Sequence, residues 1–92
     1  MIKQLKIKVI GQVQGVGFRS WTCKIARELN LVGFVKNMDD GSVEIIAEGD
    51  KRTLKKFLEA LREGPPLAEV KDIFVEEKDL EETQFSTFEI RY

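Results

Sequence analysis

The sequence contains no histidine, and this absence excludes several classes of enzyme. Serine or cysteine nucleophiles paired with histidine, histidine general bases and most catalytic zinc sites all need an imidazole. Cysteine is nearly absent as well, and the single Cys23 cannot form a disulfide within the chain. The first residues, Met1 to Gln4, also lack the features of a signal peptide. Both observations predict a cytoplasmic protein.

The chain also lacks a dominant charge and a long apolar run. It has 15 basic and 16 acidic residues, giving a formal net charge of -1. Such a balance provides no overall field that would attract nucleic acid or an acidic membrane, although it is compatible with a local basic pocket. No segment approaches the roughly 20 apolar residues of a membrane span. We therefore expect residues 1–92 to form a single domain, monomeric and without nucleic-acid or membrane partners.

The first half of the chain has the pattern of a strand, a loop, a helix and two more strands. Leu5, Ile7 and Val9 alternate with lysines, as in a strand with one buried face. After a glycine-rich loop over 11–18, apolar residues recur at the four-residue spacing of a helix: Trp21, Ile25 and Leu29. Strands are predicted over 33–37 and 43–48, joined by a two-residue hairpin turn at Asp40-Gly41.

The second half adds a helix and two strands. Asp50 is a suitable cap for a helix whose apolar face comprises Leu54, Phe57, Leu58 and Leu61. The run Gly64-Pro65-Pro66 ends this helix. A strand containing Val70, Ile73 and Val75 is expected next. The acidic run over 76–82 is then interpreted as a solvated loop, and 85–92 as a last strand.

The resulting order, β-α-β-β-α-β plus a C-terminal strand, predicts an α+β fold: a ferredoxin-like split βαβ sandwich. Its mixed, largely antiparallel sheet carries two helices on one face. In this arrangement the first two strands run parallel, with the third between them. The glycine loop and residue 37 are therefore expected at the same edge of the sheet, and the last strand should return there with Arg91 and Tyr92.

The loop from Gly11 to Arg19 has the composition of an anion site. Glycines allow backbone N–H groups at a helix start to curl around an anion, and an arginine in the first turn adds a planar fork for phosphate oxygens. A tight strand-to-helix turn with an exposed arginine explains the same residues. Asn37 likewise suits an ordinary turn or cap. Its predicted position across from the loop favours a functional role.

These two segments resemble the two signatures of the acylphosphatase family. The first runs as Gly11-x-Val13-Gln14-Gly15-Val16-Gly17-Phe18-Arg19. The second runs as Gly33-Phe34-Val35-Lys36-Asn37-x-x-x-Gly41-x-Val43 and is closed by Gly49. Both match without a gap, and the resemblance extends over the whole chain. Ser20 and Met38 are minor departures that do not fall on a matched functional position.

The resemblance implies a metal-free hydrolase of acyl phosphates that needs no cofactor and releases inorganic phosphate. Its catalytic residues are Arg19, which binds the phosphate, and Asn37, which orients the attacking water. It also implies a substrate-binding segment: Gln14, Gly15, Val16, Gly17, Phe18 and Arg19. The chemistry suits a chain without histidine, because a carboxylate leaving group, with a conjugate-acid pKa of about 4, departs without a general acid.

Three alternatives deserve comparison. An RNA-binding module of the same fold class normally displays exposed aromatic rings within a basic field, and here Phe34 alone is near the right place. A sensor that binds a phosphorylated ligand without turnover fits the loop equally well. A metal chaperone is excluded by the lone cysteine and the missing histidine. We expect Cys23 and Trp21 to serve packing rather than catalysis.

Overall fold

The computed structural model describes residues 1–92 and contains five strands and two helices. Their order along the chain is β1 (Ile2–Gln12), α1 (Phe18–Glu28), β2 (Val32–Asn37), β3 (Val43–Gly49), α2 (Lys51–Glu63), β4 (Glu69–Leu80) and β5 (Phe88–Arg91). The predicted order of elements is therefore confirmed. Neither helix is long and apolar enough to span a membrane.

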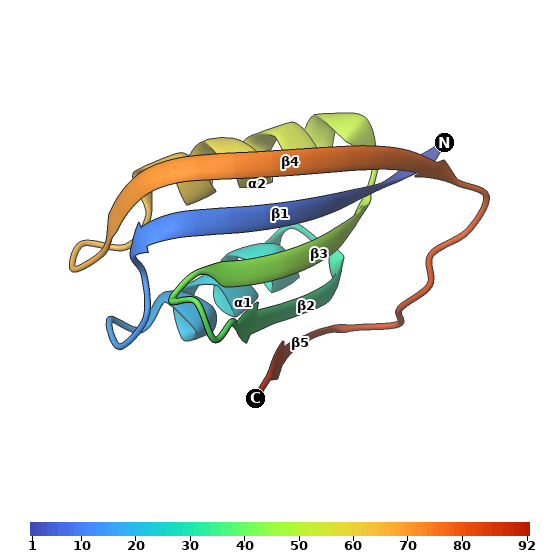
Figure 1. Cartoon of the computed structure of the whole chain (residues 1–92). Coiled ribbons are helices and arrows are strands. Elements are labelled where there is room, and N and C mark those ends of the chain that lie inside the picture. The colour runs from blue at the N-terminus through green and yellow to red at the C-terminus, as the bar shows by residue number, and fades with distance from the viewer.

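The strands form one sheet in the order β4-β1-β3-β2-β5 (Figure 1). β3 lies between β1 and β2 and is antiparallel to both, as the ferredoxin-like topology requires. β4 pairs antiparallel with β1, whereas β5 runs parallel to β2. The glycine loop after β1 and the hairpin between β2 and β3 consequently lie at the same end of the sheet (Figure 1).

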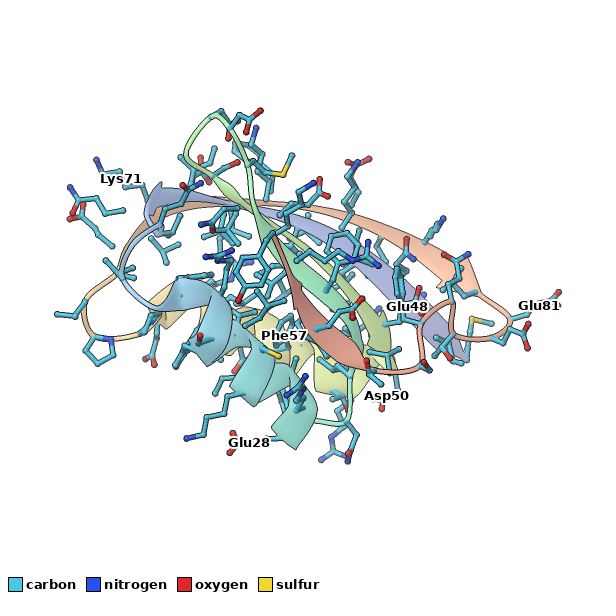
Figure 2. All side chains as sticks on the ribbon, turned by 90° about the horizontal axis from the view of Figure 1, so that it is seen from below. Glu28, Glu48, Asp50, Phe57, Lys71 and Glu81 are labelled. Atoms are coloured by element: carbon cyan, nitrogen blue, oxygen red, sulfur yellow. The ribbon has the colours of Figure 1, made fainter.

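Both helices cover one face of the sheet (Figure 1). α1 packs against β2 and β5, while α2 packs against β1, β3 and β4. The alternating apolar residues of the strands meet the apolar stripes of the helices in a core of 16 buried residues. Phe57 of α2 lies between the two layers (Figure 2), where its ring stands edge-on to Phe88 of β5 at 6.2 Å. This contact connects α2 to the strand farthest from it in the sheet.

The ends of α2 follow the predicted capping. The Asp50 side chain accepts a 2.9 Å hydrogen bond from the backbone N–H of Thr53. Gly64 ends the helix, and its N–H donates to the carbonyl of Ala60. The hydrogen bonds from Thr53 hold the pKa of Asp50 below its ordinary value.

Four details differ from the sequence-based expectation. β1 extends through Gln12, so the glycine loop is shorter than predicted. The connection between β2 and β3 is longer than a two-residue turn: Met38 and Ser42 flank the loop, and Gly41 ends its turn at a φ of 92°. Residues 76–80 belong to β4 rather than to a loop. The last strand is confined to Phe88–Arg91.

The face of the sheet away from the helices is partly covered by the connection between β4 and β5. The buried carboxylate of Glu48, at the end of β3, accepts hydrogen bonds of 2.6 Å from the side chain of Gln4 and from the backbone N–H of Gln84. Glu48 lies toward the end of the sheet where Glu81 is found, and Lys71 lies toward the other end (Figure 2). This carboxylate therefore anchors the segment that leads into β5.

Candidate functional site

The loop between β1 and α1 has a backbone suited to enclosing an anion. Gly15 and Gly17 both have a φ of 76°, whereas the intervening Val16 does not have a positive φ. When left-handed and right-handed backbone conformations alternate along a chain, successive N–H groups turn toward one side and form a concave surface of hydrogen-bond donors. A Cβ atom at either glycine would meet nothing within 4 Å. The glycines are thus required by the backbone conformation rather than by crowding, and the loop faces open space.

The start of α1 leaves its N–H groups free. Gly17 is the N-cap, and no side chain caps the helix. The first helical hydrogen bond runs from the N–H of Trp21 to the carbonyl of Gly17 at 3.0 Å, and none is formed by the backbone N–H groups of residues 15–20. These donors carry the positive end of the helix dipole. Phe18 is buried and fixes the helix start to the core.

Arg19 occupies the first turn of α1, partly buried and without an ion-pair partner. Its Nη1 donates to the backbone carbonyl of Arg91 at 3.5 Å. Its guanidinium carbon lies 4.7 Å from the centroid of the Tyr92 ring. Both contacts arise because Lys36 of β2 pairs with Arg91 of β5, which brings the end of β5 close to the start of α1. The expected position of Arg91 and Tyr92 is confirmed.

Asn37 is the last residue of β2 and pairs with Val43 across the hairpin. Its side-chain oxygen is buried and accepts no hydrogen bond. A buried amide oxygen without a donor is uncommon in folded proteins and marks a group that is not committed to structure. Asn37 also lines a cavity of about 320 Å³ with Lys36, Met38, Asp39 and Asp40. The amide is therefore not locked by a protein partner.

Hydrogen bonds and an ion pair stabilise the hairpin that follows Asn37. The carboxylate of Asp40 accepts hydrogen bonds from the hydroxyl and the N–H of Ser42, and it forms an ion pair with Lys8 of β1 at 2.9 Å. The hydroxyl of Ser42, followed by Lys8, holds the pKa of Asp40 well below its ordinary value. The N–H of Met38 donates to the carbonyl of Ser42 at 2.8 Å. These contacts fix the strand end that carries Asn37.

Gln14 connects the glycine loop to that hairpin. Its side-chain nitrogen donates to the carbonyl of Met38 at 2.8 Å and to the carbonyl of Ser42 at 2.9 Å. Both amide hydrogens thus point to the hairpin, and the Oε1 oxygen accepts no hydrogen bond. Sequence reasoning placed Gln14 in the substrate-binding segment and did not foresee these bonds. No local sequence signal indicates them, because they join segments that are distant in sequence.

The remaining residues singled out from the sequence have structural surroundings. Cys23 is buried in α1, with its sulfur 3.7 Å from the carbonyl of Phe88. Trp21 is partly buried against the core and stacks at a tilt on Phe18. Phe34 is covered by Phe85 and by the guanidinium of Arg91, 4.1 Å above its ring, so it offers no free face for base stacking. No cluster of three acidic, cysteine or histidine residues is suited to a metal ion.

The chain is similar to known proteins over nearly its full length. Residues 5–90 match the acylphosphatase family. The chain is 49% identical to the acylphosphatase of Archaeoglobus fulgidus over 88 residues, 96% of this chain and 97% of the relative. It is 50% identical to that of Thermotoga maritima over 91 residues, 99% of each. The crystal structure of acylphosphatase from Bacillus subtilis superposes with a TM-score of 0.92 at 46% identity, covering 98% of this chain and 99% of that one.

Proposed function

The chain belongs to the acylphosphatase family, and from this premise we propose that it hydrolyses the carboxyl-phosphate bond of acyl phosphates. The observation that carries the proposal is the convergence of three free groups at one end of the sheet. These are the unbonded N–H groups of the loop before α1, the guanidinium of Arg19, which has no ion-pair partner, and the buried amide oxygen of Asn37, which accepts no hydrogen bond.

The loop and Arg19 hold the phosphate of the substrate. Backbone N–H groups from Gly15 to Phe18 donate to its oxygens, and the guanidinium adds charge-assisted hydrogen bonds from a planar fork. These donors are directed before the substrate arrives, so they stabilise charge on the equatorial oxygens without reorganisation during the reaction. Gln14 contributes to the same segment through its contacts with the hairpin.

Asn37 orients the attacking water, because its amide can both accept from and donate to a single water molecule. The water oxygen forms a bond to phosphorus while the bond from phosphorus to the carboxylate oxygen breaks, and the electron pair of that bond leaves with the carboxylate. A phosphate oxygen takes the proton from the water. The products are a carboxylate and dihydrogen phosphate, which balances charge and atoms for an acyl phosphate dianion and one water.

This division of labour needs no strong acid or base. The transition state of phosphoryl transfer is loose, so the protein contributes mainly position and charge stabilisation. The carboxylate leaves as a weak base, and protonation of the leaving oxygen is not required. The side chains available at the end of the sheet are sufficient for these two tasks, which is consistent with a chain that contains no histidine.

Hydrolysis of a generic acyl phosphate by the purified protein tests the proposal. We expect release of inorganic phosphate in excess EDTA, and at least a hundredfold lower rate with an alkyl phosphate monoester at equal concentration, because an alkoxide leaves far less readily than a carboxylate. Binding of inorganic phosphate without turnover of the acyl phosphate would instead identify a phosphate sensor. Loss of activity in EDTA, restored by a divalent ion, contradicts the metal-free mechanism.

We further propose that residues 1–92 act as a single domain, as a cytoplasmic monomer that binds a small molecule and neither nucleic acid nor membrane. The nearly balanced charge and the single buried cysteine support this assignment. Light scattering coupled to gel filtration should give a mass close to 10.6 kDa at working concentration. A mass of twice that value contradicts the monomer.

A further inference from the structure

Two separate chain segments supply the site, and a single side chain joins them by hydrogen bonds. The glycine loop precedes α1, whereas Asn37 belongs to the hairpin of β2 and β3. The only hydrogen bonds between residues 13–18 and 36–43 are the two from the side-chain nitrogen of Gln14. The relative position of the phosphate donors and of Asn37 therefore depends on this amide more than on any other polar contact.

The acceptors of Gln14 are well placed to transmit its position. Met38 directly follows Asn37, and its N–H donates to the carbonyl of Ser42, which is the second acceptor of Gln14. One planar NH2 group thus spans the two residues that flank the turn. Asp40 holds the opposite side of the same turn through Ser42 and Lys8. Asp40 therefore holds the hairpin against β1, and Gln14 holds it against the glycine loop.

We propose that Gln14 is a positioning residue that sets the geometry between the water held by Asn37 and the phosphate held by the loop. The inference rests on the proposed function. Its nitrogen has both hydrogens engaged with carbonyls, so it does not donate to the substrate. Small displacements between two reacting groups reduce rate steeply, whereas an exposed hydrogen bond that water can replace contributes little to stability. Gln14 accordingly acts on turnover through Asn37, with little effect on phosphate affinity or folding.

A double-mutant cycle tests the inference. We expect Gln14→Ala to lower kcat by about 10- to 100-fold, while the inhibition constant of inorganic phosphate changes by less than about threefold. In the Asn37→Ala background the same change should lower kcat by less than about twofold, because the group that Gln14 positions has been removed. Gln14→Met, which keeps the length of the side chain without its donors, should reproduce Gln14→Ala. Gln14→Glu should be at least as slow, since a carboxylate faces two carbonyl oxygens there.

Gln12→Ala is the matched control. Gln12 is the exposed last residue of β1, two positions before Gln14, and its side chain forms no hydrogen bond, so kcat should stay within about twofold of the wild type. Urea unfolding of each variant shows that the fold is retained.

Three outcomes overturn the inference. Equal kcat losses from Gln14→Ala with and without Asn37 show that the two residues act independently. A loss of phosphate affinity as large as the loss of kcat shows that Gln14 binds substrate directly. If Asn37→Ala alone leaves kcat unchanged, the proposed role of Asn37 fails together with this inference. In the first of these outcomes, when Asn37→Ala is itself slow, only the role of Gln14 fails.

Discussion

The guanidinium of Arg19 is stacked against the ring of Tyr92, with its central carbon 4.7 Å from the ring centroid. Tyr92 is otherwise exposed, and it reaches the site because β5 runs parallel to β2. The ring contributes a cation–π contact to an arginine that has no ion-pair partner. Arg19, which we propose binds the phosphate, is thus supported by the C-terminal residue, the position most distant from it in sequence.

We predict that Tyr92→Ala weakens inorganic phosphate binding by about 2- to 5-fold, because an exposed cation–π contact contributes about 0.5–1 kcal/mol. Tyr92→Phe retains the ring and should bind phosphate as the wild type does. Competitive inhibition by phosphate provides the measurement. Tighter binding in the alanine variant would indicate that the ring holds Arg19 away from the phosphate.

Replacement of Arg19 and replacement of Asn37 should have different effects on phosphate affinity and on kcat. Arg19→Ala should remove phosphate binding and turnover together, since charge-assisted hydrogen bonds contribute about 1.5–3 kcal/mol each. Arg19→Lys should restore little, because an ammonium group does not reproduce the planar fork. Asn37→Ala should keep phosphate affinity and lower kcat by about 100-fold or more. Calorimetry with phosphate, beside kinetics with one acyl phosphate, separates the two effects; equal losses of affinity contradict the assignment.

The pH dependence of kcat should be nearly flat between about pH 5.5 and 8, once ionisation of the substrate is taken into account. The chain has no histidine, and no other side-chain type ordinarily titrates in this range. Steady-state rates in buffers of constant ionic strength test this. A bell-shaped profile centred near neutrality would indicate a perturbed carboxylate or lysine engaged in proton transfer.

Replacement of Cys23 by alanine should preserve activity. Cys23 is buried in α1 with its sulfur near the carbonyl of Phe88, on the helix face that packs against β5. Loss of one buried sulfur atom should lower the free energy of unfolding by about 1 kcal/mol, while kcat remains within about twofold of the wild type. Urea denaturation and kinetics on the same sample provide the measurements. Inactivation by a thiol reagent that substrate prevents would place Cys23 in the site instead.

Acid should destabilise the protein partly through Asp50. Hydrogen bonds from Thr53 lower the pKa of Asp50 in the folded state relative to the unfolded chain. The unfolded state therefore binds the proton first, and the stabilisation is complete above about pH 4 and is lost as pH falls through the folded pKa. Asn is an equally good cap but does not ionise. Between pH 5 and pH 2, the urea midpoint of unfolding should therefore fall less for Asp50→Asn than for the wild type.

The control for this measurement is Glu59→Gln, on the exposed side of the same helix, where the carboxylate forms no hydrogen bond. Its acid sensitivity should match that of the wild type. If Asp50→Asn and the wild type lose the same amount of stability on acidification, the cap does not contribute to the pH dependence.

The topology of the sheet could be predicted from the sequence because apolar periodicity is strong where one face is buried. Leu5, Ile7 and Val9 alternate cleanly for this reason, and the parallel return of β5 to the site followed from the strand order. The extent of β4 could not be predicted. It is an edge strand with charged side chains that remain exposed, and ion pairs of Lys3 with Glu77 and Asp79 support it. Such a sequence has the composition of a loop.

The candidate site, like the fold, could be predicted from the sequence only in part. The glycines and Arg19 form a local pattern whose chemistry can be derived from residue types and spacing. The hydrogen bonds of Gln14 to the hairpin, and the stacking of Tyr92 on Arg19, depend on tertiary contacts that no local pattern encodes. The length of the hairpin was also missed, because the pair Asp40-Gly41 indicates a turn without giving the number of residues that flank it.

The interleaved order of the strands has a consequence for the time course of folding. The β2–β3 hairpin is a local pairing, whereas Gly33 meets Phe88 and Ile2 meets Leu80 only after most of the chain has been brought together. Pairings between distant segments form slowly because the closure of a long loop precedes any gain from contact. The loop and Asn37 can therefore assemble before β5 docks. The pairings that join the loop to Asn37 are thus closer in sequence than the pairing of Gly33 with Phe88 that brings Tyr92 to Arg19.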